Sequence, residues 1–166
     1  MFWRKILYLF VIISAVSGCS GYRPEPPTYA PPAPAPVPRA ERSEALLQAL
    51  LALGVDYKYG GKSPLTGFDC SGLVAHVYKE AWGIRLPLNA QGQSKVGTPI
   101  GLAELQAGDL VFYDTMKQPY SHVGIYMGDG KFVHAPKTGA QVRVESIKAA
   151  YWSQRFNGAR RIEPPL

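Results

Sequence analysis

Apolar residues recur at helical spacing in two places of this chain. Residues 39–53 carry leucines three and four positions apart, which predicts a helix. Residues 70–82 carry a second apolar face, with Asp69 before it as a candidate N-cap and Gly83 after it as a stop. The pattern therefore predicts two helices, followed by a weaker and shorter one that begins near Asn89.

Further along the chain the period of the pattern changes to two. Residues 55–61 already form a short strand-like stretch. Alternating apolar and polar residues, separated by Gly, Pro or Asp-Gly turns, then predict five strands, at residues 109–113, 122–127, 131–135, 142–145 and 158–162. Helices followed by strands favour an α+β fold over an alternating α/β fold. We expect N-terminal helices packed on an antiparallel sheet of about five strands.

The first eighteen residues have the pattern of a secretory signal. Two cations precede the apolar run 6–13, which is too short to span a bilayer but long enough for a signal peptide. Small residues then lead into Cys19, an ending that resembles a bacterial lipobox, in which the cysteine is lipidated and becomes the mature N-terminus. The alternative is an ordinary secretory signal cleaved near the same place. By resemblance to Gram-negative lipoproteins, Ser20 favours an anchor in the outer membrane, facing the periplasm.

Composition divides the rest of the chain into a tether and a globular domain. Residues 19–40 contain eight of the fifteen prolines and are expected to form an extended, semi-rigid spacer. Residues 41–166 form the predicted domain. From residue 41 onward the chain has 14 basic and 11 acidic residues without a basic run, so nucleic-acid binding is not expected. Two cysteines are too few for a disulfide scaffold or a four-ligand structural zinc site.

Cys70 is the candidate nucleophile. If Cys19 is lipidated, Cys70 has no disulfide partner, and a lone thiol outside the cytoplasm needs a reason. Its predicted position is the first turn of a helix, where partly positive N–H groups would stabilise a thiolate and lower the thiol pKa. A buried structural cysteine is the alternative.

Two histidines can meet on a predicted hairpin. A three-residue loop at residues 128–130 would pair Gly124 with His134 and place His122 and His134 on the same side of the sheet. A two-residue Asp-Gly turn would place them on opposite faces. We favour the longer loop because it also forms one continuous apolar face. Packed against the start of the Cys70 helix, the hairpin would supply a base and a residue that orients it. His76 lies off the apolar face of its helix and is expected to be a solvated surface residue.

A zinc site that uses Cys70, His122 and His134 is a chemical alternative. It would be a bare set of three ligands with no carboxylate to reinforce it. We therefore expect no metal and no cofactor.

Four segments carry a family resemblance. They are FDCSGLV, GDLVFY, HVGIY and FVHA, at residues 68–74, 108–113, 122–126 and 132–135. In this order they resemble the successive motifs of the NlpC-type cell-wall peptidases, papain-like cysteine enzymes that cut peptidoglycan stem peptides. The resemblance implies a papain-like NlpC fold, with Cys70 as nucleophile, His122 as general base and acid, and His134 as the residue that orients His122.

The same resemblance implies a wider site and leaves some questions open. It places Tyr57 near the oxyanion, and Asp69 and Ser71 where residues of several relatives help to hold the free amine of the substrate or shape the pocket. Many relatives have Leu-Pro-Arg and then Ser or Thr where this chain has Leu-Pro followed by Leu88 and Asn89, so substrate preference is open. The expected function is a monomeric peptidoglycan endopeptidase, a lipoprotein whose membrane contact is the lipid anchor at Cys19. An amidase or acyltransferase on the same fold, or a lipoprotein that only binds peptidoglycan, are the alternatives.

Overall fold

The computed structural model describes residues 39–165. The predicted signal peptide, Cys19 and the proline-rich tether up to residue 38 lie outside the described residues, and the first helix begins at Arg39, two residues before the predicted start of the domain. Within the described part, none of the helices has the length and apolar character needed to cross a membrane. The elements in chain order are α1 (Arg39–Leu51), β1 (Lys62–Ser63), β2 (Gly67–Phe68), α2 (Cys70–Trp82), α3 (Ala90–Gln93), β3 (Thr98–Ile100), a 3-10 turn η1 (Leu102–Glu104), β4 (Leu110–Tyr113), β5 (His122–Gly128), β6 (Lys131–His134), β7 (Arg143–Ser146), α4 (Ala150–Ser153) and β8 (Phe156–Arg161).

The main sheet has six strands in the order β3-β8-β4-β5-β6-β7, and every neighbouring pair is antiparallel. The five strands predicted from alternation are all present, so the α+β prediction is confirmed. The sixth strand, β3, was missed because it is three residues long and contains Pro99. It lies at the edge of the sheet, where proline is tolerated. The stretch 55–61 forms only two isolated bridges, Asp56 with Gln141 and Tyr57 with Phe68.

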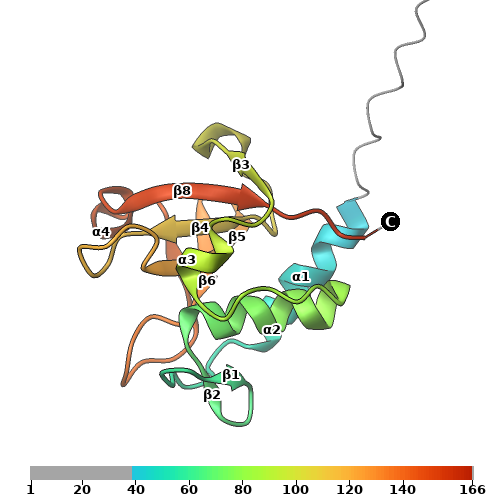
Figure 1. The fold of residues 1–166 in the computed structure, drawn as a ribbon, viewed down its shortest axis with the longest axis vertical. Coiled ribbons are helices and arrows are strands. Elements are labelled where there is room, and N and C mark those ends of the chain that lie inside the picture. Colours follow the sequence, from blue (N-terminus) through green and yellow to red (C-terminus); the bar gives the residue numbers. More distant parts are fainter. Residues whose placement is uncertain (1–38, 166) are drawn as a thin grey trace, which may run out of the picture. The chain divides into compact units, whose positions relative to one another are not determined.

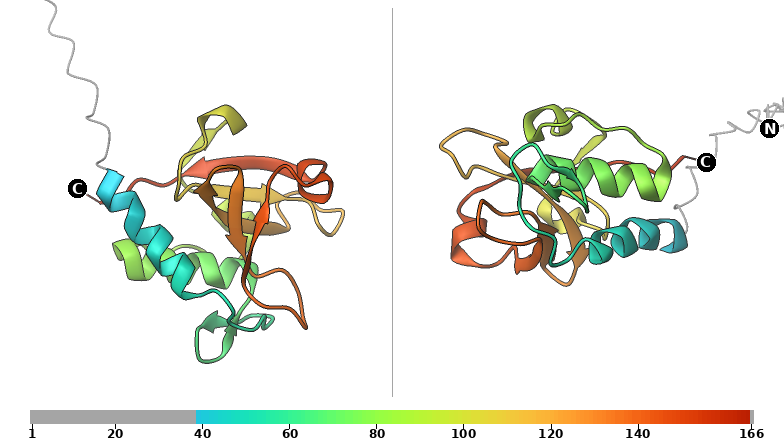
Figure 2. Two further views of the ribbon diagram at one scale, coloured as in Figure 1. Left: turned by 180° about the vertical axis from the view of Figure 1, so that it is seen from behind. Right: turned by 90° about the horizontal axis from the view of Figure 1, so that it is seen from below.

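The sheet separates two apolar clusters. Alternate strand residues such as Leu110, Phe112 and Ile125 join α1 and α2 in the main core. Their neighbours in sequence, among them Val111 and Tyr113, face the other way and pack with Trp152 of α4 in a smaller aromatic cluster. Figures 1 and 2 show α1 and α2 side by side and the small β1–β2 ribbon beside the start of α2. The catalytic candidates therefore lie where α2 meets the sheet.

Helix α2 is capped at both ends as the sequence predicts. The Asp69 side chain accepts a hydrogen bond from the backbone N–H of Gly72, and Gly83 adopts a left-handed conformation with φ 67° at the other end. These caps satisfy backbone groups that would otherwise lack partners, and they fix where the helix begins. His76, expected to be solvated, is instead half-buried with its ring 5.1 Å from that of Phe68.

Helix α1 packs through small residues. Ala45, Ala49 and Ala52 are almost completely buried against the main core, whereas Leu50 and Leu51 are 44% and 69% exposed. The leucine spacing therefore predicted the helix correctly without showing its buried face. Alanines at this contact let the backbones of α1 and α2 approach closely.

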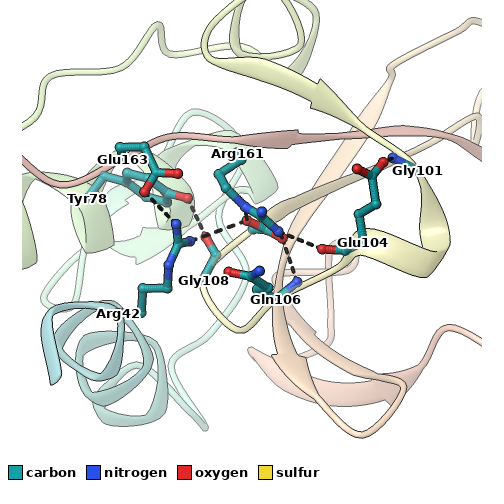
Figure 3. Close-up of polar contacts among 9 residues, drawn as sticks. Arg42, Tyr78, Gly101, Glu104, Gln106, Gly108, Arg161 and Glu163 are labelled. Carbon is teal, nitrogen blue, oxygen red and sulfur yellow. Dashed lines mark hydrogen bonds and ion pairs between the residues drawn. The ribbon is translucent and has the colours of Figure 1, made fainter. Parts of the chain in front are cut away.

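A buried ionic cluster holds the beginning and the end of the domain together. Asp109 is fully buried and accepts two hydrogen bonds from Arg161 of β8, at 2.9 and 2.8 Å. Arg42 of α1 lies 3.5 Å from the same carboxylate and also pairs with Glu163 beyond β8. Figure 3 shows Arg42 and Arg161 pointing toward this shared centre from different elements. Figure 1 places the C-terminal segment beside the start of α1, in agreement with these contacts.

Candidate active site

The loop before α2 is organised around Asp69. Its Oδ1 accepts the N–H of Gly72 at 2.6 Å and the hydroxyl of Ser71 at 2.9 Å, while its Oδ2 accepts the N–H of Gly60 at 2.9 Å. The hydroxyl of Ser71 also lies 3.2 Å from the carbonyl of Leu88. Asp69 therefore caps the helix and ties the Gly60 loop to it, so the residue that follows, Cys70, is held in a fixed position.

Cys70 is a free thiol at the first position of α2. Burial raises its pKa to about 11, and the neighbouring Asp69 carboxylate adds to the increase. The backbone N–H groups of Val123, Ser71 and Cys70 itself act in the opposite direction, but they are weaker. The N–H groups at the helix start therefore act in the predicted direction, but burial outweighs them and the net pKa of the resting thiol is raised. The contact with the Val123 N–H places the sulfur beside the first residues of β5, the strand that begins with His122.

His122 and His134 meet as the hairpin prediction requires. Nε2 of His122 lies 2.8 Å from Nδ1 of His134, and the two rings are nearly perpendicular.

Ile125 pairs with Val133 in the register expected for the longer loop. The predicted three-residue loop itself is wrong, because Gly128 pairs with Lys131 across a two-residue turn, and an irregularity between Tyr126 and Gly128 restores the register. Glycine at position 124 allows strands β5 and β6 to approach closely here, because a Cβ at this position would lie 2.8 Å from the carbonyl oxygen of Val133.

Both imidazoles are uncharged at neutral pH. Burial lowers the pKa of His122 to about 3, and His134 acts in the same direction. Burial also lowers the pKa of His134 to about 4, although Glu145 acts against it. The indole of Trp152 stacks on His122 with ring centroids 5.4 Å apart and covers the edge of His134. The pair is thus enclosed by aromatic groups and fixed in orientation.

Three residues around His134 were not foreseen from the sequence. Oε1 of Glu145 lies 3.4 Å from Nε2 of His134 and 2.5 Å from the guanidinium of Arg143, and the indole N–H of Trp152 donates to Oε2. The alternation of residues 142–145 does place Arg143 and Glu145 on one face of a strand. It does not say that this strand pairs with β6, where His134 stands opposite Arg143.

These side chains line one cleft of about 840 Å³. Cys70 and His122 lie in its wall together with Tyr57, Asp69 and Ser71, so the structure brings five of the six predicted site residues to one cleft, and His134 stands directly behind His122. Tyr57 lines the same cleft as Cys70 and Asp69. Burial raises the pKa of its phenol, with smaller contributions from these two residues, so the phenol carries its proton at neutral pH. The other lining residues include Leu88, Asn89, Lys137 and Tyr151.

The geometry does not favour the zinc alternative. Nε2 of His122 and Nδ1 of His134 face each other across a hydrogen bond, so these two nitrogens are not free to hold a common ion with Cys70. Among residues 39–165 there is also no cluster of three or more His, Cys, Asp or Glu side chains arranged to hold a metal ion.

A half-buried thiol at a helix start, in one cleft with the first histidine of a hydrogen-bonded pair on a hairpin, agrees with one family profile. The profile of the NlpC/P60 family matches residues 54–161. The chain belongs to the NlpC/P60 family. The resemblance seen in the sequence is confirmed, and so is the papain-like NlpC fold. The matched range covers the cleft and both histidine strands.

Curated members of the NlpC/P60 family resemble this chain over most of its domain. It is 41% identical over 124 residues to the murein DD-endopeptidase MepH of Escherichia coli, which covers 73% of this chain and 46% of that protein. It is 39% identical over 109 residues to the murein DD-endopeptidase MepS of the same organism, covering 66% and 56% of the two chains. The chain thus spans about half the length of these two relatives.

Solved NlpC/P60 structures have the same fold. The NlpC/P60 domain of the peptidoglycan hydrolase SagA is 32% identical, with a TM-score of 0.64, and the match covers 73% of this chain and 98% of that domain. A lipoprotein-like NlpC/P60 protein from Staphylococcus aureus is 35% identical, with a TM-score of 0.69 over 80% of this chain and 45% of that one.

Proposed function

We propose that this protein is a cysteine peptidase that hydrolyses amide bonds in the peptide part of peptidoglycan. The observation that carries the proposal is the shared cleft, in which Cys70 at the start of α2 lies beside the hydrogen-bonded pair of His122 and His134. Family membership supports the cysteine chemistry. The names of the relatives MepH and MepS, both murein DD-endopeptidases, support the substrate class.

The first step of the reaction is transfer of the Cys70 proton. Nε2 of His122 is occupied by His134, so Nδ1 is the nitrogen left to accept this proton. The thiolate sulfur then attacks the amide carbonyl carbon, and the carbonyl π electrons move to oxygen to give a tetrahedral intermediate. Because burial raises the pKa of the resting thiol, Cys70 keeps its proton until His122 removes it.

The oxyanion is stabilised where α2 begins. Backbone N–H groups at this helix start stabilise the developing charge, and the protonated Tyr57 hydroxyl, which lines the same cleft, donates a further hydrogen bond. The imidazolium of His122 gives its proton to the leaving amine as the C–N bond breaks, which leaves a thioester on Cys70. Water, deprotonated by His122, then hydrolyses the thioester to a carboxylic acid and restores the thiol.

Asp69 and Ser71 form the wall where the substrate's free amine is expected to bind. The Asp69 carboxylate accepts backbone hydrogen bonds at both oxygens and retains lone pairs that face the cleft. Leu88 and Asn89 line the same wall in place of the cationic loop of many relatives, so this protein is expected to discriminate substrates here differently.

We further propose that the mature protein is a monomer anchored in the outer membrane by acyl chains on Cys19, facing the periplasm. The apolar run before Cys19, the small residues that lead into it and the proline-rich segment that follows support this arrangement. Metabolic labelling with an alkyne fatty acid tests it, and Cys19→Ala should lose the label.

The activity is tested with purified protein and sacculi that contain diaminopimelate. Soluble products are separated and weighed by mass spectrometry. We expect stem-peptide fragments or split cross-links, abolished in Cys70→Ala and by iodoacetamide but not by EDTA. Release of whole stem peptides would indicate the amidase alternative. Full activity in Cys70→Ala would exclude the mechanism, and binding to sacculi with no product from the wild type would indicate a binding protein.

A further inference from the structure

Glu145 lies behind the histidine pair, and none of the proposed reaction steps assigns it a role. Nε2 of His134 is fully buried and forms no hydrogen bond of normal geometry among the described residues, but Oε1 of Glu145 lies 3.4 Å away. The Glu145 side chain is only 24% exposed. Its other oxygen accepts the indole N–H of Trp152. The carboxylate is therefore fixed against the far side of His134.

The hydrogen bond between the histidines makes the tautomer of one ring depend on the other. For Nδ1 of His122 to accept the Cys70 proton, the neutral ring of His122 must carry its proton on Nε2 and donate it to His134. Nδ1 of His134 must then be the acceptor, so the proton of His134 must reside on Nε2. That Nε2–H group of His134 points toward Glu145. If the neutral ring of His134 carried its proton on Nδ1 instead, it would donate to Nε2 of His122, and the proton of His122 would then lie on Nδ1.

We propose that Glu145 is a positioning residue that fixes the tautomer of His134 and, through it, leaves Nδ1 of His122 ready to accept the Cys70 proton. The proposal rests on the proposed function, because it assigns Cys70 and His122 their roles in that reaction. A carboxylate accepts hydrogen bonds and cannot donate them, so it stabilises only the tautomer with a proton on Nε2. This arrangement resembles a catalytic triad extended by one residue.

The other groups around Glu145 do not replace it. Arg143 on the same strand binds Oε1 with its guanidinium, which partly neutralises the carboxylate but supplies only donors. Trp152 of α4 is also only a donor. Burial raises the pKa of Tyr113 on β4, with Glu145 contributing, so its phenol stays protonated. Arg143, Trp152 and His134 thus converge on a single acceptor group, and only Glu145 can accept from all three.

The direct test is the tautomeric state of the two rings in the wild-type protein. Long-range ¹H–¹⁵N NMR at pH 7.5 separates protonated from unprotonated ring nitrogens. We expect both His122 and His134 to carry their proton on Nε2. A proton on Nδ1 of His134 would overturn the proposal. The measurement needs no substrate, so its result does not depend on whether sacculi are cleaved.

Variants then test the consequence for Cys70, with the rate of alkylation by iodoacetamide as a second readout that needs no substrate. In Glu145→Gln one amide oxygen faces three donors, so we expect mixed tautomers and an alkylation rate at pH 7.5 that is lower by about tenfold to a hundredfold. The difference in alkylation rate between Glu145→Gln and the wild type should shrink as the pH approaches the pKa of the Cys70 thiol, where the thiolate forms without a base. A purely structural defect would leave the difference unchanged. Glu163→Gln, remote from the site, is the matched control and should react like wild type.

Arg143→Gln separates positioning from simple stabilisation by an ion pair. It breaks the same ion pair as Glu145→Gln but leaves the carboxylate on His134, so we expect at least the wild-type rate of alkylation. Equal losses in Arg143→Gln and Glu145→Gln would overturn the proposal, because the ion pair alone would then explain both. Thermal unfolding of each variant confirms that the comparison is between folded proteins.

Discussion

At the scale of single residues, the resting site holds a thiol and two uncharged imidazoles. Burial raises the pKa of Cys70 to about 11 and lowers that of His122 to about 3, so a charged pair is disfavoured before substrate enters. A neutral thiol is a poor nucleophile and resists oxidation. The cleft therefore protects Cys70 from oxidation, and activation depends on donors that act only once charge develops.

Tyr57 is the side chain at which the need for a hydrogen-bond donor to the developing charge is most easily measured. Its hydroxyl lies near Cys70 and keeps its proton, so it can donate to an oxyanion but contributes little to binding of the neutral amide. We expect Tyr57→Phe to lower kcat on a muropeptide substrate by about a hundredfold, with a small change in KM. Steady-state kinetics followed by chromatography of the products measure both constants.

Tyr59→Phe is the matched control for this substitution. It removes the same hydroxyl two positions away, from a side chain that is 87% exposed at the rim of the cleft. We expect a change in kcat of less than about threefold. Equal losses in the two variants, or a Tyr57→Phe loss confined to KM, would argue against oxyanion stabilisation by Tyr57.

At the scale of elements, the β5–β6 hairpin shows how far alternation can predict a site. The paired apolar residues fixed the register, which placed both histidines on one face as expected. The prediction of the turn was wrong in detail, because Gly128 rather than Met127 pairs with Lys131. A bulge in β5 between Tyr126 and Gly128 absorbs the residue that this pairing adds to the strand. A register is set by many side chains, whereas a bulge depends on local backbone angles that alternation does not report.

Helix α1 shows the limit of the same reasoning, and it makes a prediction about stability. The buried face consists of alanines, so adding volume there must push α1 away from α2. We expect Ala49→Leu to lower the free energy of unfolding by about 1–3 kcal/mol. Leu51→Ala, on the exposed face, should change it by less than about 0.5 kcal/mol. Urea denaturation compares the two, and a larger loss in Leu51→Ala would show that the leucine face is covered.

Contacts between strands distant in sequence could not be predicted in the same way. Cys70, His122 and His134 were found because each belongs to a local pattern, a helix start or a hairpin. Glu145 is found only when the order of the strands is known, since it reaches His134 across the pairing of β6 with β7. Tyr57 was placed by resemblance to a family, because residues 55–61 form isolated bridges that no period describes.

At the scale of the whole domain, buried ionisable groups are of two kinds. The Asp109 carboxylate is paired with Arg161 and Arg42, and these contacts link α1 to the end of the sheet (Figure 3). His122 and His134 are instead held as neutral rings by burial. The histidines therefore make stability depend on pH just below neutrality.

The histidine pair therefore predicts a loss of stability in mild acid. In the folded domain the two pKa values lie at about 3 and about 4, while in the unfolded chain both return to their ordinary value near 6.5. As the pH falls from about 6.5 to about 4, the unfolded chain takes up protons that the folded domain does not. The free energy of unfolding should fall by up to about 1.4 kcal/mol per pH unit for each histidine, and the contribution of the histidines should be constant above pH 7. Glu145, whose pKa is lowered by Trp152 and Arg143 against the effect of burial, adds to the loss only at lower pH.

Urea denaturation between pH 7.5 and 5 measures how the free energy of unfolding changes with pH. A His122→Gln/His134→Gln double variant should retain only the smaller contribution of His76, whose pKa burial also lowers. A flat wild-type profile over this range, or an equally steep one in the double variant, would show that the pair is not held neutral by burial.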